Sequence, residues 1–108
     1  MKKVRHGDVL IIPVDKVSGK IVNRTMNFEN RVVENCLKQG EAVDHFHRVK
    51  CGDVTFREDE KGTLYMSVES DSATITHEEH GDVELKKGNY GVYEQREYHP
   101  DKEKAVYD

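Results

Sequence analysis

Turn-forming residues interrupt this chain about every ten positions, and this spacing constrains the fold more than any other feature. The main breaks fall at Gly40, Gly52, 60–62, Asp71, 81–82 and 88–89. The segments between them are long enough for strands but leave little room for helices of three turns. The spacing therefore predicts an all-β fold of the sandwich or small-barrel type.

Most segments between the breaks alternate apolar and polar residues, which is the period of a strand with one buried face. We predict strands at 8–14, 31–36, 42–50, 53–58, 63–69, 72–77, 83–86 and 89–98. Segment 16–30 lacks this alternation, so we predict an irregular loop there, a candidate lid, and a charged tail at 100–108. Residues 1–108 are expected to form a single antiparallel β-barrel or sandwich domain of the jelly-roll-like kind.

Composition limits what holds the domain together and what it binds. Hydrophobic residues make up 35% of the 108 positions and no Trp is present, so the core is lean and a bound metal or a homo-oligomer would supplement it. The formal net charge of −4 argues against nucleic acid as a partner. No apolar run reaches the ~20 residues of a membrane helix, and the first residues lack a signal peptide. We therefore expect a cytoplasmic protein without membrane contact.

The two cysteines, Cys36 and Cys51, lie fifteen positions apart and form no C-x-x-C motif. In a reducing compartment we expect buried free thiols and no disulfide.

Six histidines are present, and His45 and His47 form the more informative of two close pairs. Side chains at positions i and i+2 of a strand project from the same face, so both imidazoles can reach a common point. Val43 and Val49 share that face, which indicates that the histidines point into an apolar interior. An imidazole in such surroundings needs hydrogen-bond partners or a metal.

His77 and His80 form the second pair and bracket Glu78 and Glu79. Alternation places His77 on the same face as Ile75, and the Gly-Asp turn that follows decides whether His80 curls back toward His77. The H-E-E-H spacing does not match the helical H-E-x-x-H zinc motif, so this pair alone is a weak signal.

Together the two pairs supply nitrogen and oxygen donors that suit Zn, Fe, Mn or Ni. We therefore predict a divalent-metal site with His45, His47, His77 and His80 as ligands. The alternative is a set of solvated or hydrogen-bonded histidines without a metal.

The carboxylates and the C-terminal segment supply the other candidate catalytic residues. Glu78 or Glu79 would act as the acid–base group, with a pKa raised by its neighbour. Arg96 would stabilise a developing anion and Tyr98 would donate a proton. Without a metal, paired histidines could themselves act as base and acid in phosphoryl or acyl chemistry.

Gly-Asp-Val occurs three times, at 7–9, 52–54 and 81–83, and two copies are preceded by His6 and His80. We interpret this as recurrent turn chemistry, because Gly-Asp favours a turn and Val favours the start of a strand.

Residues 40–47, GEAVDHFH, resemble the first metal motif of cupins, which are small β-barrels in which a Gly precedes an H-x-H pair. Residues 7–14, GDVLIIPV, are similar to a cupin strand. The spacing from Gly40 to His45 is one residue shorter than in cupins, and Cys51, Gly52 and Asp53 stand where a cupin has Glu. The resemblance implies a barrel whose H-x-H pair binds a divalent metal.

The whole chain also resembles a group of small uncharacterised phage and bacterial proteins. The segments that carry this resemblance are R-x-G-D-V at 5–9, the H-x-H segment at 40–47, THEEHG at 76–81 and QREY at 95–98. It supports the organisation of the chain and implies no reaction.

These features predict a metal-binding, cupin-like protein that acts as a hydrolase or lyase on a small-molecule substrate. One alternative is a metal-independent phosphodiesterase or ribonuclease that uses paired histidines. The other is a non-catalytic phage accessory or interaction module whose Tyr- and Arg-bearing C-terminal strand makes a homo-oligomer or binds a host protein.

Overall fold

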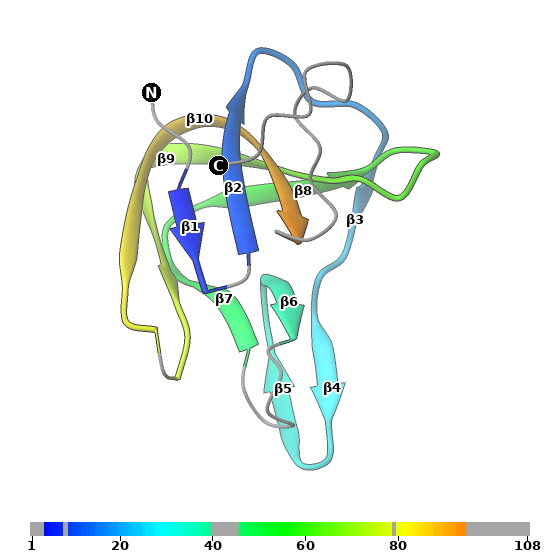
Figure 1. Cartoon of the computed structure of the whole chain (residues 1–108). Helices are drawn as coiled ribbons and strands as arrows, with labels where there is room; N and C mark the ends of the chain where they lie inside the picture. Colours follow the sequence, from blue (N-terminus) through cyan, green and yellow to red (C-terminus); the bar gives the residue numbers. More distant parts are fainter. Residues whose placement is uncertain (1–3, 8, 40–45, 79, 95–108) are drawn as a thin grey trace.

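The computed structural model describes residues 4–7, 9–39, 46–78 and 80–94, and its regular structure is β throughout (Figure 1). The strands are β1 (Val4–His6), β2 (Val9–Val14), β3 (Lys20–Val22), β4 (Met26–Phe28), β5 (Arg31–Val33), β6 (Cys36–Gln39), β7 (Phe46–Cys51), β8 (Val54–Glu58), β9 (Leu64–Thr76) and β10 (Val83–Glu94). All their pairings are antiparallel, which confirms the predicted small all-β antiparallel domain. No helix able to cross a membrane is found within these ranges.

The strands form one eight-stranded sheet and a separate two-stranded hairpin made of β4 and β5. The main sheet has the order β1-β2-β10-β9-β7-β6, and β8 pairs with both β9 and β3. Strand β9 organises the sheet, since one edge pairs with β10 while the other pairs first with β8 and then with β7. The sheet therefore divides into two halves that share β9 and β10. The hydrogen-bonded path runs from β1 to β6 without closing in the part of the chain that the structure describes.

Strands β9 and β10 bend together where the sheet divides (Figure 1). In β9 the buried side chains occupy even positions up to Val68 and odd positions from Ala73 onward, so the strand changes its inward face at the bend. Beside it, β10 has a register shift between Lys86 and Gly88. The sequence predicts turns at both places, and this prediction is wrong. The chain bends there without reversing, so four predicted strands merge into two.

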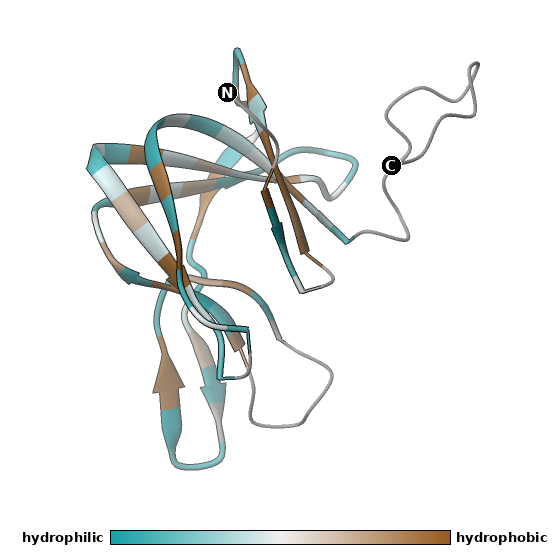
Figure 2. Cartoon of the chain, turned by 60° about the vertical axis from the view of Figure 1, so that its left-hand side comes forward, coloured by the Kyte–Doolittle hydropathy of each residue, from teal (hydrophilic) through white to brown (hydrophobic). Residues whose placement is uncertain are grey.

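The main hydrophobic core joins β2, β6, β7, β8, β9 and β10. Apolar residues alternate with polar ones along the strands (Figure 2), and the inward set includes Ile11, Met66, Ile75 and Tyr90, each with 0% exposure. Tyr90 is thus a core residue, and its hydroxyl donates a hydrogen bond to the Lys86 carbonyl oxygen at 2.5 Å.

A smaller core cluster connects the hairpin to the main sheet. It contains Val33 of β5, Cys36 of β6 and Phe46 of β7, and Met26 of β4 packs against it. Each of the three buried residues is at most 3% exposed. The hairpin is therefore anchored at its base while it extends away from the sheet (Figure 1).

Segment 16–30, predicted as an irregular loop, contains β3 and β4, so the predicted loop is wrong, while the lid role stays a prediction. Three-residue strands are too short for alternation to be visible in the sequence. The predicted strand at 31–36 is divided into β5 and β6 at Asn35, which has a φ of 52°. The predicted tail at 100–108 lies outside the described residues.

The two cysteines have different environments. Both are free, but Cys36 is buried and Cys51 is exposed, so the expected burial is wrong for Cys51. Burial raises the pKa of the Cys36 thiol, with Arg24 acting in the opposite direction.

Candidate functional site

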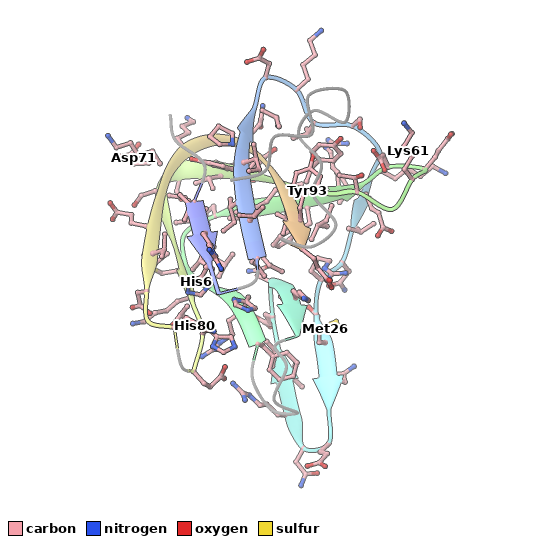
Figure 3. All side chains as sticks on the ribbon, in the orientation of Figure 1. His6, Met26, Lys61, Asp71, His80 and Tyr93 are labelled. Atoms are coloured by element: carbon pink, nitrogen blue, oxygen red, sulfur yellow. The ribbon has the colours of Figure 1, made fainter. Side chains whose placement is uncertain are left out.

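Four imidazole rings gather at one end of the main sheet, those of His6, His47, His77 and His80. The distances between ring centroids range from 4.3 Å, for His47 and His77, to 6.2 Å, for His6 and His77. Figure 3 labels His6 and His80, whose rings are 6.0 Å apart. We call this group the histidine cluster.

The four rings come from three parts of the backbone. His6 ends β1 and His47 lies in β7, two strands that are not neighbours in the sheet. His77 follows β9 directly, and His80 belongs to the turn that leads into β10. His77 and His80 are close in sequence, whereas the arrangement of the bent sheet brings His6 and His47 next to them.

Three rings of the cluster are removed from solvent. His6, His47 and His77 are 2%, 1% and 5% exposed, whereas His80 is exposed. Gly7 packs against the rings, because a Cβ atom there would lie 2.8 Å from Nε2 of His80 and 3.1 Å from Cε1 of His47. Its φ of +64° also favours glycine. A residue without a side chain is therefore needed beside the cluster.

Hydrogen bonds fix the orientation of the His6 ring. Its Nε2 atom lies 2.8 Å from the Gly81 carbonyl oxygen, and its Nδ1 atom lies 2.9 Å from Nδ1 of His47. A carbonyl oxygen only accepts, so Nε2 of His6 carries the hydrogen. In the tautomer with its only hydrogen on Nε2, Nδ1 of His6 holds a lone pair and accepts from Nδ1 of His47. A carbonyl partner on one ring nitrogen and an inward lone pair on the other is also how metal-ligating histidines are oriented.

The donor set suits a divalent transition metal, but the rings have the spacing of a hydrogen-bonded cluster. Two imidazole nitrogens on one tetrahedral zinc ion lie about 3.3 Å apart, whereas the Nδ1 atoms of His6 and His47 are 2.9 Å apart. Among the residues that the structure describes, no group of three or more His, Cys, Asp or Glu side chains is arranged to hold a metal ion. Metal binding would therefore replace the His6–His47 hydrogen bond and move these rings.

The turn that carries His77 and His80 is tied to its surroundings through Asp82. Thr76 donates a hydrogen bond to Oδ1 of Asp82 at 2.5 Å, and Lys50 of β7 pairs with Oδ2 at 3.1 Å. These bonds from Thr76 and Lys50 lower the pKa of Asp82. The turn is thus held against β7, the strand that supplies His47.

Glu78 lies beside His77 in sequence but makes its bonds with the outer side of β7 and with the hairpin. Its carboxylate accepts hydrogen bonds from Arg31 at 2.8 Å, the Phe46 backbone N–H at 2.8 Å and Arg48 at 3.2 Å. Burial acts to raise its pKa, but the hydrogen bonds from Arg31 and Phe46, with the charge of Arg48, lower that pKa to about 2. The expected rise in the Glu78 pKa is therefore wrong, because its neighbours are cations.

Three of the four predicted metal ligands, His47, His77 and His80, come together in the structure. Alternation in β9 correctly places His77 on the buried face, and His80 does curl back, with its ring centroid 4.5 Å from that of His77. His45, Glu79, Arg96 and Tyr98 lie outside the described residues, so their predicted roles stay predictions.

Sequence reasoning missed His6 as a member of the cluster. Its signal was the repeated His-Gly-Asp-Val, which begins at both His6 and His80. The interpretation as turn chemistry is correct for the glycines, since Gly7, Gly52 and Gly81 all have positive φ. It overlooked that the two histidines before these turns meet in space.

The fold and the site define a small antiparallel β domain with a buried histidine cluster. The chain belongs to the family described as "Domain of unknown function (DUF8820)", whose model matches residues 5–95. That range includes all four histidines of the cluster. No curated protein and no solved structure matches the chain.

Proposed function

We propose that this domain binds one divalent transition-metal ion through His6, His47, His77 and His80. The observation that carries the proposal is the meeting of four imidazoles from three separate segments of the chain, three of the rings being buried. Burying an imidazole costs free energy unless its ring nitrogens form hydrogen bonds or bind a metal. One cation can bind several ring nitrogens at once. Neutral nitrogen donors favour Zn, Ni or Fe over Mg or Ca.

We extend this proposal to a hydrolytic or lyase reaction on a small molecule. A bound ion of this class lowers the pKa of a coordinated water or polarises a carbonyl group. The Glu78 carboxylate accepts hydrogen bonds from Arg31 and Arg48, so we propose Glu79 as the acid–base catalyst. His45 remains a proposed ligand through the cupin-like H-x-H pair.

Metal content after purification without an affinity tag is the direct test. We expect about one ion per chain by elemental analysis, and single His6→Ala, His47→Ala and His77→Ala variants should bind the ion at least roughly tenfold more weakly. Zinc at about 100 times its Kd should stabilise the domain by about 2.7 kcal/mol, which raises Tm by roughly 10 °C. Folding of each variant is checked by far-UV circular dichroism.

Glu84→Gln, an exposed change on β10, serves as the matched control and should keep full metal content. His45→Ala is measured in the same series, because loss of metal there would add His45 to the ligand set. If the wild-type chain binds Zn, Ni and Fe no better than the quadruple histidine variant, the proposal is wrong.

The buried His6–His47 hydrogen bond favours a second candidate, metal-free acid–base catalysis by the paired rings. One ring would accept a proton while its partner donates one, as in phosphodiester cleavage. Activity that persists in EDTA, with a bell-shaped pH profile that His47→Ala abolishes, would support this candidate and count against the metal.

A further inference from the structure

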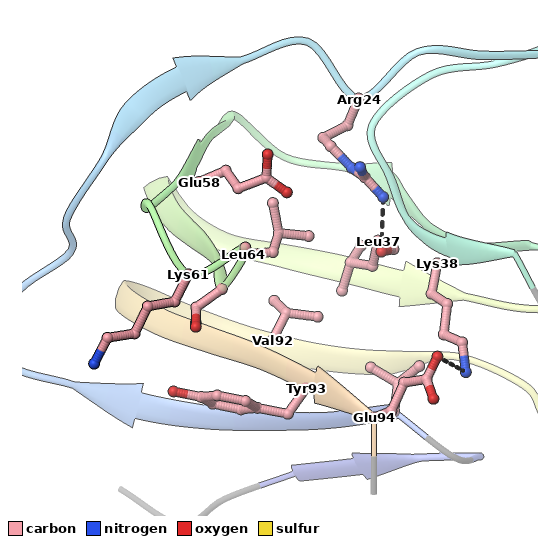
Figure 4. A pocket seen from close by; sticks show the side chains of 12 residues that line it. Arg24, Leu37, Lys38, Glu58, Lys61, Leu64, Val92, Tyr93 and Glu94 are labelled. Carbon is pink, nitrogen blue, oxygen red and sulfur yellow. Dashed lines mark hydrogen bonds and ion pairs between the residues drawn. The ribbon is translucent and has the colours of Figure 1, made fainter. Parts of the chain in front are cut away.

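A concave site lies where β6, β10 and the turn between β8 and β9 meet (Figure 4). Its volume is about 430 Å³, which is within the usual range for small-molecule sites. The described residues that line it do not include the four clustered histidines. We call it the Arg24 cavity.

The inner wall of the Arg24 cavity is apolar. Leu37, Leu64 and Val92 line it, and each is at most 8% exposed as part of the main core. Tyr93 forms a flat side of the cavity (Figure 4), because its ring lies against Gly91. A Cβ atom at Gly91 would be only 2.8 Å from Cε2 of that ring. The cavity therefore presents a preformed surface for an apolar group.

Charged side chains surround this apolar wall. Arg24 donates hydrogen bonds through Nε to the Cys36 carbonyl oxygen at 2.9 Å and through Nη2 to the Leu37 carbonyl oxygen at 3.1 Å. These bonds hold the guanidinium in place, and since it has five N–H groups, three remain for a ligand. On another side of the cavity, Lys38 and Glu94 form an ion pair at 2.9 Å, so their opposite charges offset each other.

Glu58 provides a negative charge on the same cavity. Its carboxylate and the Arg24 guanidinium both project toward the cavity in Figure 4. Within the described ranges, no ion pair of 4.0 Å or less joins Glu58 to Arg24 or to Lys61. The cavity thus offers a fixed cation and a separate anion beside an apolar wall.

We propose that the Arg24 cavity binds a small zwitterion with an apolar body, the class of the free apolar α-amino acids. The ligand carboxylate is placed on Arg24, the ammonium group on Glu58, and the aliphatic side chain between Tyr93 and Leu64. Glu58 would repel a simple anion. A neutral apolar molecule would displace water from Arg24 and Glu58 without forming hydrogen bonds to them in its place. A free amino acid carries both charges next to its apolar group.

Isothermal titration of the full chain with three related compounds tests this proposal. L-leucine has both charges, 4-methylpentanoate lacks the amine, and 3-methylbutylamine lacks the carboxylate. We expect leucine to bind at least about tenfold more tightly than either analogue, since each analogue loses one charge-assisted hydrogen bond. Equal affinity for leucine and 4-methylpentanoate, or no binding of leucine, would overturn it.

Charge-neutral variants locate the site. Glu58→Gln, at an exposed position, should weaken leucine binding about tenfold while leaving 4-methylpentanoate binding equal or stronger. Arg24→Gln should weaken both, and Arg24→Lys is measured beside it because Arg24 also bonds to β6. Glu84→Gln and Lys87→Gln, exposed and outside the cavity lining, are the matched controls. Unchanged leucine affinity in Glu58→Gln would contradict the proposal.

Discussion

At the scale of single residues, Glu78 shows how neighbours in space decide what a side chain does. Its position beside two histidines indicates an acid–base role, yet its carboxylate bonds to Arg31, Arg48 and the Phe46 N–H. A carboxylate held this way is ionised at neutral pH, and it links the hairpin, β7 and the turn after β9. Glu78 therefore holds the backbone next to His77 in place.

Glu78→Gln in metal-free protein should reduce the free energy of unfolding by about 1–2 kcal/mol at pH 7. This magnitude is lower than that of a buried charged hydrogen bond, because the carboxylate is partly exposed and solvent screens it. The pKa of Glu78 falls from its usual 4.5 to about 2 on folding, so its stabilisation is present above pH 4.5 and is lost as pH falls toward 2.

Urea unfolding at pH 7, 4 and 2.5 with EDTA present measures this effect. The difference between wild type and Glu78→Gln should shrink steadily with acid, and Glu84→Gln should show almost no difference at any pH. A difference that stays constant down to pH 2.5 would show that Glu78 does not stabilise through its charge.

At the scale of elements, the joint bend of β9 and β10 decides the architecture. It lets one strand pair with β8 along its first half and with β7 along its second half. The turn between β7 and β8 packs into this bend at Gly52, which has a φ of +107°. A Cβ atom there would lie 2.7 Å from Cα of Ala73 and from the Ser72 carbonyl oxygen.

Gly52→Ala should reduce the free energy of unfolding by about 3 kcal/mol, since it adds a backbone clash to the strain of a positive φ. Gly62→Ala is the matched control, because its φ is +84° but nothing lies within 4 Å of the added Cβ atom. Gly62→Ala should reduce the free energy of unfolding by about 1 kcal/mol, because only the backbone strain of the positive φ acts there. Thermal unfolding measures both losses of stability. Equal losses in the two variants would show that a clash with β9 does not contribute to the effect of Gly52→Ala.

At the scale of the whole molecule, two core clusters share strands β6 and β7. Leu37 and Val49 belong to the main cluster, while Cys36 and Phe46 belong to the smaller one under the hairpin. Because β6 and β7 each contribute residues to both clusters, the hairpin base and the main sheet should unfold as one unit. Single domains of this size usually unfold in one transition.

Val68→Ala in the main cluster and Val33→Ala in the smaller cluster should each reduce the free energy of unfolding by about 2 kcal/mol. Each variant loses the burial of two methyl groups and leaves a small cavity. Both variants should shift the same single transition. Val32→Ala, at a position 62% exposed, should change stability very little. Urea unfolding followed by far-UV circular dichroism suits a chain without Trp. A separate early transition in Val33→Ala alone would show that the hairpin unfolds independently.

The sequence by itself determined the β class and the inward faces of its strands. Alternation at Ala73, Ile75 and His77 is a local property of the extended backbone, so it is visible without the fold. It also identified three of the four clustered histidines. It failed at the bends, where Asp71 and Gly88 have the residue types of turns but lie within continuous strands.

Only the tertiary structure decided which side chains meet. The His6–His47 hydrogen bond joins residues 41 positions apart, and the bond from His6 to Gly81 spans 75 positions. Such contacts depend on strand order and on where the sheet bends, and no local period of the sequence encodes either. The same holds for Glu78, whose charge state follows from arginines on other strands rather than from the histidine next to it.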